Sequence, residues 1–416
     1  MRFGIFYEHQ LPKPWEPGDE ERLLNDAIEQ VVLADKLGLD NVWAVEHHFL
    51  DEYSHCSAPE VFLAACAART DNIRIGHGIK HTPPNYNHPA RVAEEIATLD
   101  LISNGRVEFG IGEGATRHEL GGFGIAAKEK RAQSLEAGRE IANMMALTPY
   151  PGYEGESFSM PCRNVLPKPS QKPHPPMWIA CTNRKTIEVA AENGLGALAF
   201  SFVDPAEAEH WVNTYYDIIK SDRCVPLGHT VNANIALVTG FSLHQEREEA
   251  IRRGRESFEF FRYAISAMVT LDQTPGRTTL WEDFKSIVGD NPVEGYLDKA
   301  RSYGDNYSSA IGNPDDARRH IRDLQATGVD QLIFIQQAGH NRHEHICESL
   351  ELFAAEVMGE FQAGEAERVA AKEAELAPYI EAALARKEWM QPLPEQDIPV
   401  IPAAVRVAQV PRQAAV

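Results

Sequence analysis

The sequence predicts an α/β fold: one (β/α)₈ barrel of the TIM type with long insertions and a C-terminal helical and Pro-rich extension. Strand and helix signals alternate along residues 1–361, and eight strand signals favour a closed barrel over a doubly wound sheet. One apolar strand ends abruptly in titratable residues, as expected at the rim of a catalytic sheet. The strands are expected at residues 1–7, 40–45, 72–79, 106–111, 177–180, 197–200, 231–239 and 329–335.

The helices between these strands are marked by amphipathic spacing and by their end signals. Leu24, Ile28 and Val31 share one face of a first helix, which Gly38 ends. Asp204 followed by Pro205 predicts a helix start, because Asp caps a helix and proline fits its first turn. Further helices are expected near residues 58–69, 89–102, 130–146, 183–192, 245–268, 314–327 and 344–358.

Three segments do not follow the alternation. Residues 148–176 and 270–307 are expected to be irregular insertions, and their length suggests lids or dimer elements. Residues 362–390 are rich in Ala and Glu and should be helical, whereas residues 392–416 are Pro-rich with little core material. We therefore interpret residues 1–361 as one barrel domain and residues 362–416 as a peripheral extension that packs on the barrel or on a partner subunit.

Composition excludes several classes of function. The formal net charge is −21, so the average surface repels phosphate backbones and anionic membranes. The six cysteines form no Cys-x-x-Cys pair, which gives little support to a zinc site or a disulfide framework. No apolar stretch approaches 18 residues, and the chain opens directly with a strand. We expect a soluble cytoplasmic protein that binds neither nucleic acid nor membrane.

The second strand ends in Glu46, His47 and His48. Because side chains alternate along a strand, Glu46 and His48 should share one side while His47 points to the other. This weakens a metal site built from all three, since metal ligands must converge, and we predict no bound metal. A histidine that only fixes a loop is the ordinary alternative, but its place at the end of a barrel strand favours a catalytic role.

The third and fourth strands end in glycines. Gly76 and Gly78 should weaken the third strand, so either something flat approaches its backbone or the barrel wall bends there. The fourth strand ends in Gly112-Glu113-Gly114, a loose match to a dinucleotide-binding turn. Three more glycines follow where a helix should begin, so we interpret it as a strand end with exposed backbone N–H groups.

Two cationic clusters could bind a phosphate in this acidic protein. The fifth strand runs into Thr182, Asn183, Arg184, Lys185 and Thr186, where a capping residue, cations and a hydroxyl meet at a helix N-terminus. Lys130 and Arg131 open the preceding helix. Ordinary helix capping with solvated cations explains either cluster equally well.

Taken together, the segments resemble the luciferase-like family of flavin-dependent monooxygenases over nearly all of residues 1–360. The resemblance depends on modest motifs in the same order and at similar spacing, namely Arg2-Phe3-Gly4-Ile5-Phe6, the run from Trp43 to Phe49, His88-Pro89-Ala90-Arg91-Val92-Ala93-Glu94-Glu95, Gly105-Arg106-Val107-Glu108-Phe109-Gly110-Ile111-Gly112, Glu188-Val189-Ala190-Ala191-Glu192-Asn193-Gly194-Leu195, Gly312-Asn313-Pro314-Asp315-Asp316 and Ala326-Thr327-Gly328-Val329-Asp330.

The resemblance implies a barrel that binds reduced FMN at the carboxyl ends of its strands, usually as a homodimer, with FAD or F420 as less favoured cofactors. His47 falls on the family's catalytic histidine and Gly78-Ile79 on its cis peptide beside the flavin. Residues expected to contact the cofactor are Gly78, Ile79, Gly112, Arg131, Thr182, Asn183, Arg184 and Thr186, of which Arg131, Asn183 and Thr186 fall on the family's phosphate contacts.

The sequence departs from luciferases at one place, where Gly112-Glu113 replaces their Cys-Arg. A carboxylate cannot replace an arginine on phosphate, so Glu113 is expected to face substrate or another loop. His48 and His81 are further candidates to face substrate. Light emission from an aldehyde is therefore not implied.

The activity implied by the resemblance is a two-component monooxygenase. Reduced FMN from a separate NAD(P)H flavin reductase would react with O₂ to give a C4a-peroxyflavin, with His47 as donor or base in a dry, apolar site. The substrate would be a small apolar molecule such as a terpene, ketone or aldehyde. Three alternatives remain: an F420-dependent hydride-transfer enzyme, a non-catalytic flavin-binding protein, and a metal-dependent hydrolase that uses Glu46, His47 and His48.

Overall fold

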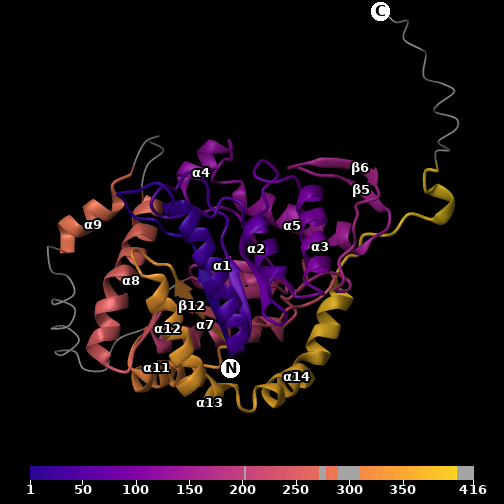
Figure 1. Ribbon diagram of the computed structural model, residues 1–416. Coiled ribbons are helices and arrows are strands. Elements are labelled where there is room, and N and C mark those ends of the chain that lie inside the picture. Colours follow the sequence, from indigo (N-terminus) through magenta and orange to yellow (C-terminus); the bar gives the residue numbers. More distant parts are fainter. Residues whose placement is uncertain (201–202, 271–277, 289–308, 401–416) are drawn as a thin grey trace, which may run out of the picture.

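The computed structural model describes residues 1–200, 203–270, 278–288 and 309–400, and its centre is a closed barrel of eight parallel strands (Figure 1). The barrel order β1-β12-β9-β8-β7-β4-β3-β2 confirms the predicted fold. Each strand overlaps one expected from the sequence. The strands are β1 (Arg2–Tyr7), β2 (Asn41–Ala44), β3 (Arg74–His81), β4 (Val107–Gly112), β7 (Met177–Cys181), β8 (Gly196–Ala199), β9 (Ile235–Thr239) and β12 (Gln331–Gln336).

Apolar strand sequences explain why the sheet closes. Every residue of β2, β4, β8, β9 and β12 is buried, because side chains face either the barrel interior or the surrounding helices. Ile5 on β1 pairs in register with Val42 on β2 and with Phe334 on β12, so the first and last strands lie side by side. This closure brings the ends of strands far apart in the sequence to one rim.

Helices surround the barrel in the expected places (Figure 1). The predicted start at Asp204 is confirmed, since its side chain accepts a hydrogen bond of 2.8 Å from the Glu207 backbone N–H. The helices of the alternating pattern are α1 (Asp19–Leu37), α2 (Pro59–Ala67), α3 (Pro89–Ile102), α5 (Lys130–Ala146), α6 (Arg184–Glu192), α7 (Pro205–Ile219), α8 (Arg247–Thr270), α11 (Pro314–Ala326) and α12 (His343–Phe353).

The insertions contain regular structure that the sequence interpretation missed. Residues 148–176 include an antiparallel hairpin of β5 (Tyr150–Glu154) and β6 (Ser159–Arg163). A short helix, α4 (Arg117–Gly122), follows β4, and β10 (Phe241–Leu243) pairs with β11 (Ala310–Gly312). The second insertion contains α9 (Leu280–Val288), although residues 271–277 and 289–307 of it lie outside the described residues.

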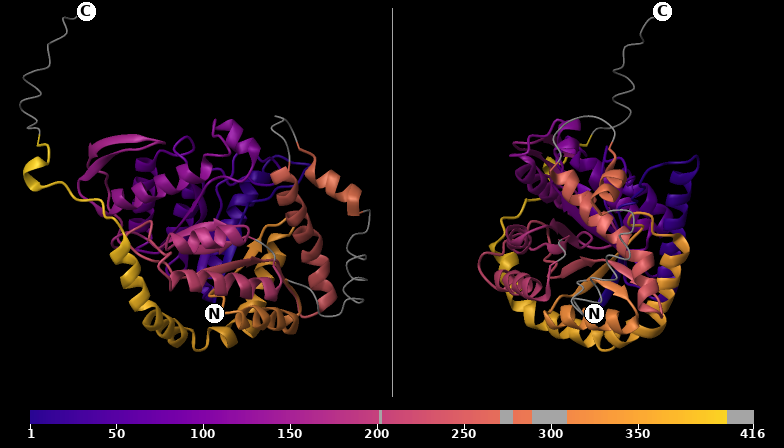
Figure 2. Two further views of the ribbon diagram at one scale, coloured as in Figure 1. Left: turned by 180° about the vertical axis from the view of Figure 1, so that it is seen from behind. Right: turned by 90° about the vertical axis from the view of Figure 1, so that its left-hand side faces the viewer.

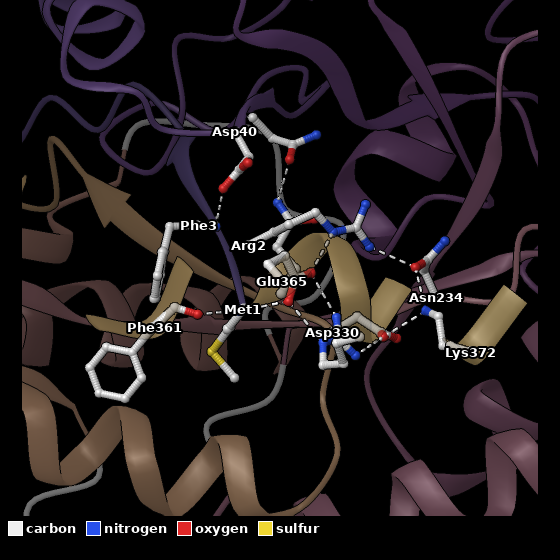
Figure 3. Close-up of polar contacts among 12 residues, drawn as sticks. Met1, Arg2, Phe3, Asp40, Asn234, Asp330, Phe361, Glu365 and Lys372 are labelled. Carbon is white, nitrogen blue, oxygen red and sulfur yellow. Dashed lines mark hydrogen bonds and ion pairs between the residues drawn. The ribbon is translucent and has the colours of Figure 1, made fainter. Parts of the chain in front are cut away.

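The C-terminal part of the described chain passes under the barrel. A π-helical turn (Ala354–Met358) and α13 (Gly359–Gln362) lead into α14 (Glu365–Arg386), which lies within the stretch expected to be helical. The two views of Figure 2 keep α14 beside the N-terminus. Figure 3 shows why: the Met1 ammonium donates to the Phe361 carbonyl at 2.6 Å and pairs with Glu365 at 2.7 Å. No helix among the described residues is both long and apolar enough to cross a membrane.

Candidate active site

A cavity of about 540 Å³ lies at the carboxyl ends of the barrel strands, opposite the end that α14 covers. Its walls come from residues that end β1, β2, β3, β4, β7 and β8, and from α5, α6 and α8. Most of the predicted site residues are brought together here. Those that line the cavity are His47, Gly78, Ile79, His81, Gly112, Glu113, Arg131, Thr182, Asn183 and Thr186.

His47 lies in the loop after β2, between two carboxylates from other elements. Its Nδ1 is 2.9 Å from Oε1 of Glu119 on α4, and its Nε2 is 3.6 Å from Oε2 of Glu8 at the end of β1. Tyr53 donates its hydroxyl to Oε1 of Glu8 at 2.9 Å. The imidazole is therefore oriented through Nδ1, while Nε2 faces the side of the cavity where Glu8 lies.

The two carboxylates determine the charge of the imidazole. Burial alone would lower the pKa of His47, but Glu119 and Glu8 raise it to about 9. Burial would likewise raise the pKa of Glu119, but the facing His47 lowers it to about 2. Burial raises the pKa of Glu8 to about 7, against the opposing effects of His47 and the Tyr53 hydrogen bond. At neutral pH His47 is thus an imidazolium with N–H donors on both nitrogens.

Glu46 and His48 contact each other in the loop after β2, although β2 ends at Ala44 and Glu46 lines the same cavity as His47. His48 Nε2 is 3.3 Å from Oε1 of Glu46, which also accepts from Asn87 at 2.9 Å. Glu46 Oε2 accepts from the backbone N–H of His81 at 2.6 Å. Burial would raise the pKa of Glu46, but its hydrogen bond from His48, together with His81 and Lys80, lowers it to about 2.

His48, which was a candidate to face substrate, is not among the residues that line the cavity. Its ring packs edge-on against Phe123, with ring centroids 4.9 Å apart. His81 does line the cavity, and burial lowers its pKa to about 4, so it is neutral. Glu46, His48 and His81 approach within 4.8 Å of one another, which the sequence interpretation did not foresee. The hydrogen bonds on Glu46 help to hold this arrangement in place.

The glycines of β3 and β4 shape the cavity wall. The peptide bond between Gly78 and Ile79 is cis, as the resemblance implied, and the strand register shifts between His77 and Lys80. A Cβ on Gly76 would lie 2.4 Å from the Trp43 ring. A Cβ on Gly112 would lie 2.2 Å from Cδ1 of Ile79. These close approaches come from the protein's own side chains, and the register shift marks an irregularity in the barrel wall, whereas the approach of a flavin to these glycines stays a prediction.

Cations and a helix N-terminus lie at another part of the same cavity. The guanidinium of Arg131 donates from Nε and Nη2 to the two oxygens of Glu113, at 2.9 and 3.1 Å. Lys130 donates to the Gly114 carbonyl at 2.6 Å and lies 3.4 Å from Glu113. Glu113 thus pairs with the first turn of α5 rather than with another loop, and because it also lines the cavity, its role toward substrate stays a prediction.

The start of α6 is closed by a reciprocal capping box, in which Asn183 accepts from the Thr186 N–H at 3.1 Å and Thr186 accepts from the Asn183 N–H at 3.1 Å. Arg184, one of the residues expected to contact the cofactor, lies apart from the others. Its guanidinium is exposed and paired with Glu207, with Nε 2.7 Å from Oε1, and it does not line the cavity.

Sequence reasoning missed Glu8, Glu119 and Tyr53. One local signal existed for Glu119: Thr116 three residues earlier caps α4, accepting from the Glu119 N–H at 3.1 Å. Glu8 directly follows the first strand, so the rule that strand ends line a barrel site would have included it.

Comparison with known proteins identifies the family. Residues 1–331 match the luciferase-like monooxygenase family. The chain belongs to that family. The chain spans about half the length of the first curated relatives it matches. One of these is the oxygenase component of the flavin-dependent trigonelline monooxygenase of Acinetobacter baylyi, 29% identical over 47% of this chain and 52% of that protein.

Two solved structures show the same barrel. The monooxygenase RslO1 from Streptomyces bottropensis is 25% identical, covers 87% of this chain and 100% of its own, and superposes with a TM-score of 0.69. An F420-dependent secondary alcohol dehydrogenase is 16% identical over 86% of this chain and 98% of its own, with a TM-score of 0.64. The luciferase-like fold thus occurs both in monooxygenases and in F420-dependent enzymes.

Proposed function

We propose that this protein is the oxygenase component of a two-component flavin-dependent monooxygenase. It takes reduced FMN from a separate NAD(P)H flavin reductase and uses O₂ to oxygenate a small apolar organic molecule, such as a terpene, ketone or aldehyde, and it acts as a homodimer. The observation that carries the proposal is one cavity at the barrel rim that combines an imidazolium held between two carboxylates, apolar walls and a cationic region beside a helix N-terminus.

The residues present fit FMN. The cavity volume of about 540 Å³ lies within the usual range of roughly 300–1,000 Å³ for ligand sites. Lys130 and Arg131 offer a phosphate two cations, and Thr182 and Asn183 line the same cavity at the positive end of the α6 dipole. A guanidinium carries five N–H donors, of which Glu113 engages those on Nε and Nη2. Glu113 reduces the positive charge of this region, but Lys130 keeps it above neutral.

Bound reduced flavin would supply the two electrons with which O₂ is activated for transfer of one oxygen atom. The chain's own residues protect that chemistry from water, because Ile79, Leu135, Ile179, Phe200 and Met268 form an apolar lining. His47 holds a proton on Nε2 that faces the cavity and can be donated to an oxygen that develops negative charge. Glu119 keeps the ring oriented through Nδ1 during this transfer.

Calorimetric titration tests the cofactor. We expect the protein to bind chemically reduced FMN under anaerobic conditions and to bind reduced F420 at least tenfold more weakly.

With reduced FMN and ¹⁸O₂, a screen of terpenes, ketones and aldehydes should give a product with one labelled oxygen. His47→Asn should keep FMN affinity and lose most turnover, roughly 10²-fold or more. Arg184→Ala is the matched control, because Arg184 lies outside the cavity.

Three results would contradict the proposal in different ways. Tight binding of F420 alone, with hydride transfer to a carbonyl substrate, would favour the F420-dependent class. If the protein binds flavin but forms no oxygenated product, and if His47→Asn behaves like the native protein, the non-catalytic flavin-binding alternative would be favoured. Hydrolysis that depends on an added divalent metal would favour the hydrolase alternative.

A further inference from the structure

Glu8 joins the first strand to the loop that carries His47. It directly follows β1, is 3% exposed and lines the cavity. Two residues of the loop after β2 bind it: Tyr53 donates to Oε1 at 2.9 Å, and Ser54 donates to the Glu8 carbonyl at 2.7 Å. The backbone and one carboxylate oxygen of Glu8 are therefore fixed by the segment that also positions the imidazole.

The other carboxylate oxygen of Glu8 is the one that faces the imidazole. Within the described residues, Oε2 is buried and has no hydrogen-bond partner, and it lies 3.6 Å from Nε2 of His47. Glu119 already engages Nδ1. The N–H on Nε2 therefore lies between two possible acceptors, Glu8 and whatever molecule occupies the cavity.

Charged groups from several elements surround this pair. His47 is approached by Glu8 from β1 and by Glu119 from α4, while Glu46 lies in its own loop. The neutral rings of Tyr53 and His81 pack at centroid distances of 5.5 and 6.1 Å. Glu8 is approached by His47, Tyr53 and Glu119. A buried carboxylate without a cation is costly, so Glu8 can stay ionised only while His47 is protonated.

We propose that Glu8 is a positioning residue that acts through His47, keeping the imidazole protonated and its Nε2–H directed into the cavity. This rests on the proposed function, in which that proton is donated. When the Nε2–H bond breaks and an O–H bond forms on the reactant, the imidazole becomes neutral. A proton from water then restores the Nε2–H bond, so that the imidazolium again faces the Glu8 carboxylate.

Titration of His47 in the flavin-free protein tests the proposal directly. Histidine ¹⁵N resonances are followed by NMR against pH, and the spectrum of His47→Asn assigns the signal of His47. In Glu8→Gln the pKa of His47 should fall by roughly 1–3 units, because a facing negative charge is lost. Glu140→Gln is the matched control: Glu140 is also buried and bound by a tyrosine, Tyr150, at 2.6 Å, but it lies outside the cavity.

Two further variants keep the test decisive. Glu8→Asp retains the charge and should hold the pKa of His47 above its value in Glu8→Gln. If Glu8→Gln does not fold, Tyr53→Phe removes a hydrogen bond that lowers the pKa of Glu8, and it should lower the pKa of His47 less but in the same direction. An unchanged pKa of His47 in Glu8→Gln, or in Tyr53→Phe if Glu8→Gln does not fold, would overturn the proposal.

The outcome does not depend on flavin binding. If reduced FMN fails to bind, the proposed function fails while the titration still decides the role of Glu8. If FMN binds and the enzyme turns over, Glu8→Gln should shift the alkaline limb of the kcat profile to lower pH and leave FMN affinity within about twofold of the native value. A loss of FMN affinity with an unshifted profile would instead indicate a purely structural role.

Discussion

Glu113 is the residue at which this chain departs from the luciferases, and the structure gives it a partner. It binds Arg131 through both carboxylate oxygens and lies 3.4 Å from Lys130. One negative charge thus offsets half of the positive charge that faces the cavity. Because Arg131 is 41% exposed, the pair is partly screened by solvent and its contribution to affinity should be modest.

Glu113→Gln should therefore tighten FMN binding. Removing the carboxylate leaves two cations for the phosphate, and we expect the Kd to fall roughly two- to fivefold. Riboflavin, which lacks the phosphate, provides the control and should bind both proteins equally. Calorimetry at two salt concentrations measures this, since the gain should shrink as salt screens it. An equal gain for riboflavin would show that Glu113 faces the ring instead.

The local sequence was enough to select His47 as a candidate, but not to find Glu8 and Glu119, the carboxylates that raise its pKa. His47 could be found because a buried strand ends three residues before it, at Ala44. Glu8 and Glu119 lie 39 and 72 residues away from it, and their approach depends on barrel closure and on the turn that α4 makes. The places of Arg184 and His48 outside the cavity lining could not be predicted for a related reason, because residue type does not show which way a side chain turns after a strand ends.

At the scale of elements, two tryptophans determine where glycine is required in the barrel wall. Trp43 on β2 pairs in register with Gly76 on β3, and Trp178 on β7 pairs with Gly196 on β8. A Cβ on either glycine would lie 2.4 Å from the neighbouring indole. The two indoles meet edge to face inside the barrel, with centroids 5.3 Å apart. Each large ring thus occupies the space that its neighbouring strand leaves open.

Gly76→Ala should destabilise the protein without touching the cavity. The Trp43 ring is fully buried and cannot move aside, so overpacking should cost about 1–3 kcal/mol in the free energy of unfolding. Gly359→Ala provides a control of opposite sign: Gly359 is helical, nothing lies within 4 Å of its added Cβ, and about 0.5–1 kcal/mol of stabilisation is expected. Urea unfolding compares both. If Gly76→Ala is as stable as the native protein, the Trp43 ring must be able to shift despite its burial.

Periodicity predicted the eight barrel strands because each is an apolar run long enough to identify. It could not predict the β5–β6 hairpin, where β6 contains Pro161 and only one of the five β5 residues, Tyr150, is buried. It also missed α4, which ends in two glycines and is fixed by the contact of Glu119 with His47 rather than by helix propensity. Tertiary contacts determine both elements.

At the scale of the whole molecule, the chain closes the base of its own barrel. Asp330, fully buried just before β12, accepts from Lys372 on α14 at 2.6 Å and from Arg368 at 3.0 Å (Figure 3). Lys372 also donates to Asn234 at 2.8 Å. Burial would raise the pKa of Asp330, but Lys372 lowers it below its usual value. The C-terminal helix thus neutralises a charge that the barrel alone would leave buried.

Lys372→Met should show how far the stability of the barrel depends on the ion pair between Lys372 and Asp330. Arg368 still faces Asp330, so we expect a loss of about 1–3 kcal/mol in the free energy of unfolding at neutral pH. Lys220→Met is the matched control, because Lys220 also joins α14 to the barrel through Glu375, but that pair is exposed and should contribute about 1 kcal/mol or less.

The pH dependence separates a charge effect from a packing effect. The pKa of Asp330 is depressed on folding, so its stabilisation is present above the unfolded-state value of about 3.9 and is lost as pH falls through the folded-state value. The stability difference between native protein and Lys372→Met should therefore shrink in denaturant melts at pH 3. A difference that stays constant from pH 7 to pH 3 would mean that α14 holds the barrel by apolar packing of residues such as Leu376 rather than through Asp330.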